Sequence, residues 1–241
     1  GRYCPCWRGM TLRFDSWESY FYPETFDPVT GNGTLKNLLD EHNATVLARR
    51  EYVRTSVRTH QIGTGAVAIA RTYDAAHVRA IHGYLFQDVY EWAGQYRTVN
   101  ITKDISTFAD VRSGQVDRYL ADMHRIVSDT PWARLDRDTF AERAASVFAY
   151  FKQAHPFREG NGRAGKVFME HVAELSQFTL DFARVTPEVW NNASMLSGPD
   201  LGGYEPVPDS LVPVFRVVAQ PRKSGSPTSR PSNPGSNNLL S

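Results

Sequence analysis

One loop decides the fold of this 241-residue chain, and its sequence is His155-Pro156-Phe157-Arg158-Glu159-Gly160-Asn161-Gly162-Arg163. Pro156 disfavours helical geometry at His155, so a preceding helix is predicted to end there. Gly160 and Gly162 allow backbone conformations that other residues avoid, and they leave room for a ligand close to the backbone. The loop therefore predicts a tight, glycine-rich turn between two helices.

Helical periodicity extends outward from this loop in both directions. Apolar residues recur every three or four positions, which is typical of amphipathic helices. Candidate N-terminal caps precede three of these segments, at Thr34, Asp74 and Asp136. Five helices are predicted, with these apolar stripes: Leu35, Leu38, Leu39, Val46, Val53 and Val57; Val78, Ile81, Leu85, Phe86 and Val89; Val116, Tyr119, Leu120, Met123, Ile126 and Val127; Phe140, Ala144, Val147, Phe148 and Phe151; and Val167, Phe168, Val172 and Leu175. A further short helix is predicted from Pro187 through Trp190.

A single segment alternates with the period of a β-strand. Its sequence is Thr98-Val99-Asn100-Ile101-Thr102, which is rich in β-branched residues. A strand needs a partner, and the nearest candidate follows Lys103 and Asp104, around residues 106–109. The predicted fold class is therefore all-α, a multi-helix bundle with one small β-hairpin.

The composition is that of an ordinary globular protein. Lys and Arg number 27 against 26 Asp and Glu, which gives a net charge of +1 and argues against a nucleic-acid-coating protein. No apolar run approaches the ~20 residues that span a bilayer, and residues 1–10 lack the apolar core of a signal peptide. Cys4 and Cys6 are poorly spaced for a disulfide, and no further cysteine completes a zinc site. A cytoplasmic location is expected.

The two ends differ in character from the middle. From about Gln220 onward Pro, Ser and Gly dominate, a composition that cannot bury a core. We expect an N-terminal extension over residues 1–19, one domain over residues 20–219 and a disordered tail over residues 220–241.

The loop also has the residue types of a phosphate-handling site. A glycine-rich turn that opens a helix presents free backbone N–H groups and the positive end of the helix dipole to an anion. Arg163 adds a planar cation, Lys166 a point charge, and Glu159 a hard oxygen ligand for Mg²⁺. His155 suits proton acceptance near neutral pH. These residues also have a structural interpretation. Glu159 and Arg163 have the spacing of a surface ion pair, and His155 lies at a helix end, where it could cap backbone carbonyls.

Residues 155–163 match, at every specified position, the signature His-x-Phe-x-Asp/Glu-Gly-Asn-Gly-Arg, and the chain thereby resembles the Fic family. The stretch from Phe86 to Gly94 looks like the segment before that family's flap, and residues 103–109 look like the flap itself. The resemblance covers roughly residues 20–218. It implies a Fic fold, in which the β-hairpin is a flap over the active site.

The resemblance further implies a nucleotidyltransferase that moves AMP from ATP to a Tyr, Ser or Thr hydroxyl of a target protein (AMPylation). His155 would deprotonate the hydroxyl, Glu159 would hold Mg²⁺, and Arg163 would stabilise the departing pyrophosphate. Gly160, Asn161 and Gly162 would cradle the phosphates, with Asn191 or Asn192 near the adenine. The flap would dock the target through Lys103, Asp104, Ile105, Ser106, Thr107 and Phe108.

One position departs from the family pattern. The motif usually ends in Gly-Arg-x-x-Arg, whereas this chain has Lys166, which keeps the charge for binding nucleotide but loses the bidentate geometry. The family's inhibitory pattern, Ser/Thr-x-x-x-Glu-Gly/Asn, is not found at either end. The expectation is a toxin–antitoxin arrangement, in which a small separate antitoxin with that helix restrains the chain; no nucleic-acid or membrane partner is expected.

Two alternatives stay open on the sequence. The first keeps the fold and uses another donor, such as UTP or GTP, because nothing in the motif fixes the base. The second is a Fic-like binding module with weak activity, for which Lys166 is the single indication and against which His155 and Glu159 argue.

Overall fold

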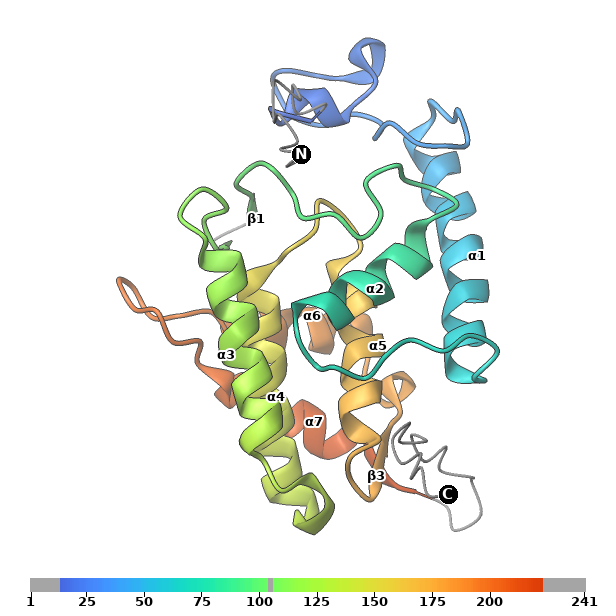
Figure 1. Cartoon of the computed structure of the whole chain (residues 1–241). Helices are drawn as coiled ribbons and strands as arrows, with labels where there is room; N and C mark the ends of the chain where they lie inside the picture. Colours follow the sequence, from blue (N-terminus) through green and yellow to red (C-terminus); the bar gives the residue numbers. More distant parts are fainter. Residues whose placement is uncertain (1–13, 104–105, 223–241) are drawn as a thin grey trace, which may run out of the picture.

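Helix α4 (Arg137–Ala154) forms the centre of the core, and ten of its 18 residues are buried. The structure, a computed structural model, describes residues 14–103 and 106–222. Helix α3 (Gln115–Asp129) runs alongside α4, and α5 (Asn161–Ala173) and α7 (Val212–Val218) pack on its other sides (Figure 1). Helix α4 thus has neighbours on several sides, and it ends just before the loop that begins at His155.

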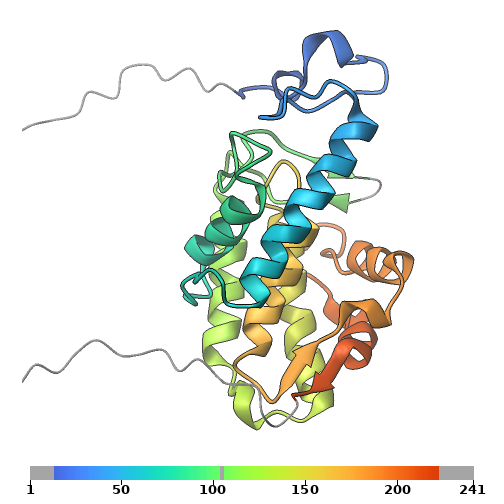
Figure 2. The ribbon, with the colours of Figure 1, turned by 90° about the vertical axis from the view of Figure 1, so that its right-hand side faces the viewer.

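The remaining helices complete a bundle around this centre. Helix α2 (Ala75–Phe86) packs on α5, and α1 (Ala44–Gly63) packs on α2 from the outside (Figure 2). Helix α6 (Pro187–Leu196) lies beside α7. Single turns of 3₁₀ helix occur at Glu18–Tyr20, Pro23–Thr25, Trp132–Arg134, Phe182–Arg184 and Pro208–Ser210.

Local capping signals explain where several helices begin. The Asp74 side chain accepts a hydrogen bond from the backbone N–H of His77 at the start of α2, and Asp136 accepts one from Thr139 at the start of α4. Both caps were predicted and are confirmed. Thr186 caps α6 in the same way, immediately before Pro187.

The helix predicted after Thr34 is wrong in its start and in its buried face. Helix α1 begins nine residues later than predicted, at Ala44, where the Asn43 side chain accepts hydrogen bonds from two N–H groups; the Thr34 hydroxyl donates to the His42 carbonyl. Asp40, at φ +50°, has a left-handed conformation that a helix cannot contain. The side chains of Val46, Val53 and Val57 are exposed, whereas α1 buries Leu47, Glu51, Thr55 and Ile62.

The β-hairpin is present but shorter than predicted. Strand β1 (Thr102–Lys103) pairs antiparallel with β2 (Ser106–Thr107), so residues 98–101 lie before the strand. Asp104 and Ile105 lie outside the described residues. A second small sheet, β3 (Phe178–Leu180) with β4 (Ala219–Pro221), was missed because its strands are too short to show alternation and lie far apart in sequence.

Both predicted domain boundaries fall within structured residues. Gln220 and Pro221 belong to β4, and residues 223–241 lie outside the described part of the chain. At the other end, the ring of Phe14 stacks on Tyr20 at 4.8 Å, and the Trp17 indole N–H donates to the Gly31 carbonyl. Cys4 and Cys6 are outside the described range. Among the described helices, none combines the length and the apolar character needed to cross a bilayer.

Candidate active site

His155 caps the C-terminus of α4 in a left-handed conformation, with φ +40° and ψ +58°. Its backbone N–H donates to the Phe151 carbonyl at 3.1 Å, which satisfies a carbonyl of the last helical turn. The following Pro156 ends the helix, as predicted. The imidazole ring stacks on the ring of Phe108, just after β2, with centroids 3.8 Å apart. The end of the hairpin therefore fixes one face of this histidine.

Arg97 joins His155 to both ends of the hairpin. This guanidinium is 2% exposed and donates to the carbonyl of His155 at 2.7 Å, of Val99 at 2.8 Å and of Ala109 at 2.5 Å. Burial lowers the pKa of Arg97 to about 10, so it remains charged at neutral pH. A single buried cation thus holds the candidate base, the chain entering the hairpin and the chain leaving it.

The turn after His155 is held by the side chain of Asn161. Its Oδ1 accepts from the Phe157 N–H at 2.9 Å, and its Nδ2 donates to the Phe157 carbonyl at 2.7 Å. Gly160 has φ +82°, and a Cβ there would overlap the ring of Phe86. Each polar atom of the Asn161 side chain thus has one partner within the turn, and the backbone N–H of Asn161 at the start of α5 is available to a ligand.

The stacked rings of Phe157 and His82 pack beneath the backbone of the same turn, on the side of the core. Phe157 is fully buried, and its ring stacks on that of His82 at 3.8 Å. The Nδ1 atom of His82 accepts from the Gly94 N–H, and its Nε2–H donates to the Glu159 carbonyl at 3.0 Å. Burial lowers the pKa of His82 to about 3, so the ring is neutral and holds this tautomer.

The first turn of α5 provides the candidate anion site. Ala164 donates the first intrahelical bond to the Gly160 carbonyl, so the N–H groups of Asn161, Gly162 and Arg163 have no partner within the helix. The Gly160 N–H donates to Oε1 of Glu159 at 2.9 Å. A carboxylate already lies against this helix start, which indicates that the backbone here stabilises negative charge.

Arg163 points from α5 toward α1. Its Nη2 forms an ion pair with Glu51, its Nη1 donates to the Thr55 hydroxyl at 3.1 Å, and Glu159 Oε1 lies 3.8 Å away. Glu51 also accepts from the Tyr90 hydroxyl, and burial beside that carboxylate raises the pKa of Tyr90. The predicted Glu159–Arg163 pair is thus the weaker of two, and the stronger comes from α1.

Lys166 lies one turn further along α5, against aromatic rings. Its ammonium is 5.3 Å from the centre of the Phe182 ring and 5.1 Å from that of Trp190. Burial lowers the pKa of Lys166, and the nearby Glu170 opposes this shift. The cation predicted for the phosphates is therefore engaged with aromatic faces.

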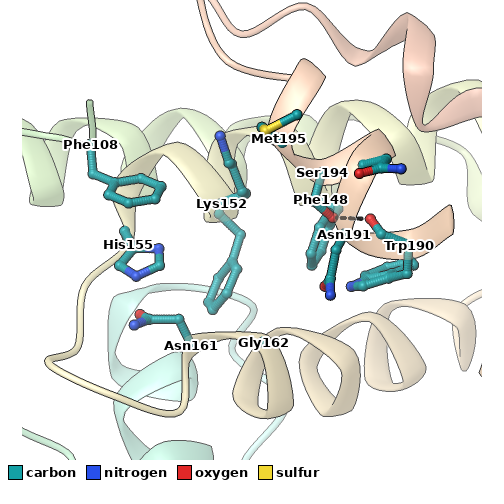
Figure 3. A pocket seen from close by; sticks show the side chains of 12 residues that line it. Phe108, Phe148, Lys152, His155, Asn161, Gly162, Trp190, Asn191, Ser194 and Met195 are labelled. Atoms are coloured by element: carbon teal, nitrogen blue, oxygen red, sulfur yellow. Dashed lines mark hydrogen bonds between the residues drawn. The ribbon is translucent and has the colours of Figure 1, made fainter. Parts of the chain in front are cut away.

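A cavity of about 360 Å³ joins these elements (Figure 3). His155, Asn161 and Gly162 line one side, and α6 lines the other. Its walls are mostly aromatic or amide, a surface suited to a nucleoside. The lining residues are Phe108, Phe148, Phe151, Lys152, His155, Asn161, Gly162, Trp190, Asn191, Asn192, Ser194 and Met195.

The predicted site residues meet here in part. His155, Asn161, Gly162, Phe108, Asn191 and Asn192 line the cavity. Glu159 and Arg163 are not among the residues that line the cavity, Lys166 lies against Trp190, and Thr107 lies in β2. Lys103 and Ser106 are in the paired strands, and Asp104 and Ile105 lie outside the described residues. Arg97, His82, Glu51 and Lys152 were missed, because each is joined to the site by contacts from elsewhere in the fold and none carries a local motif.

The sequence and the fold of this chain are similar to those of known proteins. A sequence model of the Fic/DOC family matches residues 72–173. The protein adenylyltransferase VbhT of Bartonella schoenbuchensis is 34% identical over 73% of this chain, which spans only 37% of that relative. The probable protein adenylyltransferase Fic of Salmonella typhimurium is 29% identical, with 73% and 82% of the two chains covered. The crystal structure of the BepC protein from Bartonella tribocorum, a VirB-translocated effector with bound AMPPNP, is 26% identical, superposes with a TM-score of 0.68, and is matched over 86% of this chain and 98% of its own.

Proposed function

The chain belongs to the Fic/DOC family, and we propose that it is a protein adenylyltransferase that transfers AMP from ATP to a Tyr, Ser or Thr hydroxyl of a target protein. The observation that carries this proposal is that His155 and the open first turn of α5 line the same cavity. One supplies a base for a hydroxyl, and the other binds phosphate.

In the proposed reaction, the target's hydroxyl oxygen attacks the α-phosphorus of ATP. His155 takes the hydroxyl proton on a ring nitrogen, the bond from the α-phosphorus to the bridging oxygen breaks, and pyrophosphate leaves. The N–H groups of Asn161 and Gly162 stabilise the phosphate charge, and Arg163 stabilises the leaving pyrophosphate. The hairpin, which includes Thr107 and Phe108, docks the target as an added strand.

Glu159 is the proposed Mg²⁺ ligand. Its side chain is 45% exposed and flanks the phosphate-binding turn. Among the described residues, no cluster of three His, Cys, Asp or Glu could hold a metal ion alone. That fits Mg²⁺, which commonly binds one or two carboxylates together with substrate phosphates. When bound, the ion would neutralise charge on the phosphates.

The proposal includes regulation by a separate chain and action in the cytoplasm. A small antitoxin with a Ser/Thr-x-x-x-Glu helix would restrain the enzyme. The exposed valines of α1 and the exposed Tyr52 offer such a helix an apolar surface. Purification of the chain from its native host without any small partner would contradict this part of the proposal.

The experiment is a labelling assay with host-cell lysate, Mg²⁺ and ATP carrying label at either the α- or the γ-phosphate. We expect label in protein from the α position alone. Label from the γ position would indicate phosphorylation instead. If neither position labels protein, but α-labelled UTP or GTP does, the donor is not ATP. The proposal that the chain transfers a nucleotide to a protein hydroxyl is then kept.

A further inference from the structure

A second cavity, of about 720 Å³, adjoins the first. The two cavities share Phe108, Lys152 and Met195 as lining residues. The second cavity is bounded by the end of β2, by α3 and α4, and by the loop over residues 198–204. It therefore lies directly beside the hairpin on which the target is proposed to dock.

Two buried polar atoms of α4 lack hydrogen-bond partners in this region. They are Nζ of Lys152 and Oε1 of Gln153. Both face Gly198, because a Cβ built there would lie 3.7 Å from the ammonium and 3.9 Å from the amide oxygen. A buried donor without a partner is costly, so the Lys152 ammonium indicates a missing acceptor. The Gln153 oxygen is itself an acceptor, and it would take an N–H donor, such as a backbone amide of the same ligand.

The ammonium points away from the phosphate-binding turn. Figure 3 shows Nζ of Lys152 directed toward Met195, on the side opposite Asn161 and Gly162. Burial lowers the pKa of Lys152 to about 8, so the group is mainly charged at pH 7. The ammonium lies 5.2 Å from the centre of the Phe108 ring, and a phosphate held at α5 would leave it without an anionic partner.

The charged residues that line the second cavity favour an anion. Lys152 and Arg118 are cationic, and Asp200 is anionic and exposed. The Arg118 guanidinium lies over the Tyr204 ring at 4.0 Å, which leaves its N–H edge available to an anion. Two cations and one anion leave one positive charge in excess, which one carboxylate would neutralise.

We propose that the second cavity binds the carboxylate of an Asp or Glu of the target protein, close in sequence to the modified hydroxyl. This rests on the proposed function. Lys152 lies in the last turn of α4, three residues before the C-cap His155, and both residues line the first cavity. An extended chain advances ~3.3 Å per residue, so the carboxylate would belong to a residue within about three positions of the hydroxyl.

The test begins with the lysate proteins that the wild-type chain labels from α-labelled ATP. Their modified hydroxyls are mapped by mass spectrometry, and each acceptor segment is synthesised with its neighbouring acid and with the matching amide. We expect the acidic peptide to be labelled roughly tenfold to a hundredfold faster than the amide, because a charge-assisted hydrogen bond is lost.

Three variants assign the effect. Lys152→Met should reduce the acid-to-amide ratio to near one, and Lys152→Arg should keep most of it. Gly198→Ala, whose Cβ would only touch the two polar atoms, should lower the ratio by occupying the carboxylate position. Arg143→Met, an exposed position on the same helix, is the matched control and should leave the ratio unchanged. Because the readout is a ratio within each variant, a general loss of activity does not affect it.

Several outcomes would overturn the inference. Mapped sites without an acidic neighbour would do so, as would a ratio near one in the wild-type chain or an unchanged ratio in Lys152→Met. If the wild-type chain labels no protein with any nucleotide, the proposed function itself fails, and that result is distinct from labelling without acid preference.

Discussion

The carboxylate of Glu51 holds the guanidinium of Arg163, although the two residues lie 112 positions apart in the sequence. Glu51 comes from α1, which precedes the segment matched by the family model, and its side chain is only 9% exposed. The Arg163 guanidinium also lies over the Phe86 ring at 4.7 Å. An outer helix therefore determines where the proposed pyrophosphate-binding cation points.

Glu51→Gln should weaken both folding and nucleotide binding. It leaves the Arg163 charge without its partner and removes the charged acceptor of the Tyr90 hydroxyl. We expect a loss of about 1–3 kcal/mol in the free energy of unfolding, since Arg163 is one third exposed and solvent compensates in part. Urea denaturation and ATP titration measure the two effects.

Asp88→Asn is the matched control for this prediction. Arg58, on the same helix α1, pairs with Asp88 through two hydrogen bonds and also donates to the Tyr84 hydroxyl of α2, but the Arg58 and Asp88 side chains are 25% and 40% exposed. The expected loss is below about 1 kcal/mol, with ATP affinity unchanged. Equal losses in Glu51→Gln and Asp88→Asn would show that the Glu51 pair has no special role.

Two glycines of the loop should respond in opposite ways to alanine. Gly160→Ala places a Cβ inside the Phe86 ring at a φ of +82°, so we expect a loss of several kcal/mol, of the order of 3. Gly162→Ala meets no atom within 4 Å and removes a helical glycine, so stability should be unchanged or rise by up to ~1 kcal/mol. ATP affinity should nevertheless fall in Gly162→Ala, because the methyl group enters the cavity. Unchanged ATP affinity in that variant would contradict phosphate binding at this turn.

The sequence predicted those parts of the structure that depend on local interactions. Asp74 and Asp136 cap helices through bonds that span three residues, and Pro156 ends a helix through its own ring. Thr34 failed as a cap because the segment after it is not helical: Asp40 has a left-handed conformation, and the side chain of Asn43 caps α1 instead. Lys166 was expected at the phosphates, but its ammonium lies against the rings of Phe182 and Trp190. These rings are distant from Lys166 in sequence, so local sequence could not predict the contact.

Acid should destabilise the fold through three buried histidines. Burial lowers the pKa of His77 to about 4 and of His82 and His171 to about 3, whereas in the unfolded chain each titrates near 6.5. Below pH 6.5 the unfolded state therefore binds up to three more protons. Burial raises the pKa of Glu170 to about 7, so this carboxyl opposes the effect by one proton between its unfolded value of about 4.5 and pH 7.

The net expectation is a free energy of unfolding that falls by up to ~2.7 kcal/mol per pH unit between pH 6 and 5. Urea denaturation at several pH values measures the slope, and His171→Gln should make it shallower. A stability that stays constant from pH 6.5 to 5 would show that these histidines are protonated in the folded protein.

His155→Ala should abolish transfer while ATP still binds, because the ring acts on the target's hydroxyl and the phosphates bind to α5. The loss of a general base is worth ~10²–10⁴-fold in rate. Labelling with α-labelled ATP and equilibrium binding of ATP measure the two properties separately. Loss of ATP binding in a folded His155→Ala variant would contradict the assigned role.

Arg97→Met should uncouple the hairpin from the candidate base. The variant keeps an apolar side chain in the buried space but leaves the carbonyls of His155, Val99 and Ala109 without their donor. We expect a stability loss of about 2–4 kcal/mol and a larger fall in kcat than in ATP affinity, because the ring of His155 loses its fixed position against Phe108. Arg79→Met is the control, since Arg79 also donates to a carbonyl, that of Gly94, from an exposed position on α2. If Arg97→Met lowers kcat no more than Arg79→Met at matched folded fraction, the buried arginine supports the fold alone and does not position His155.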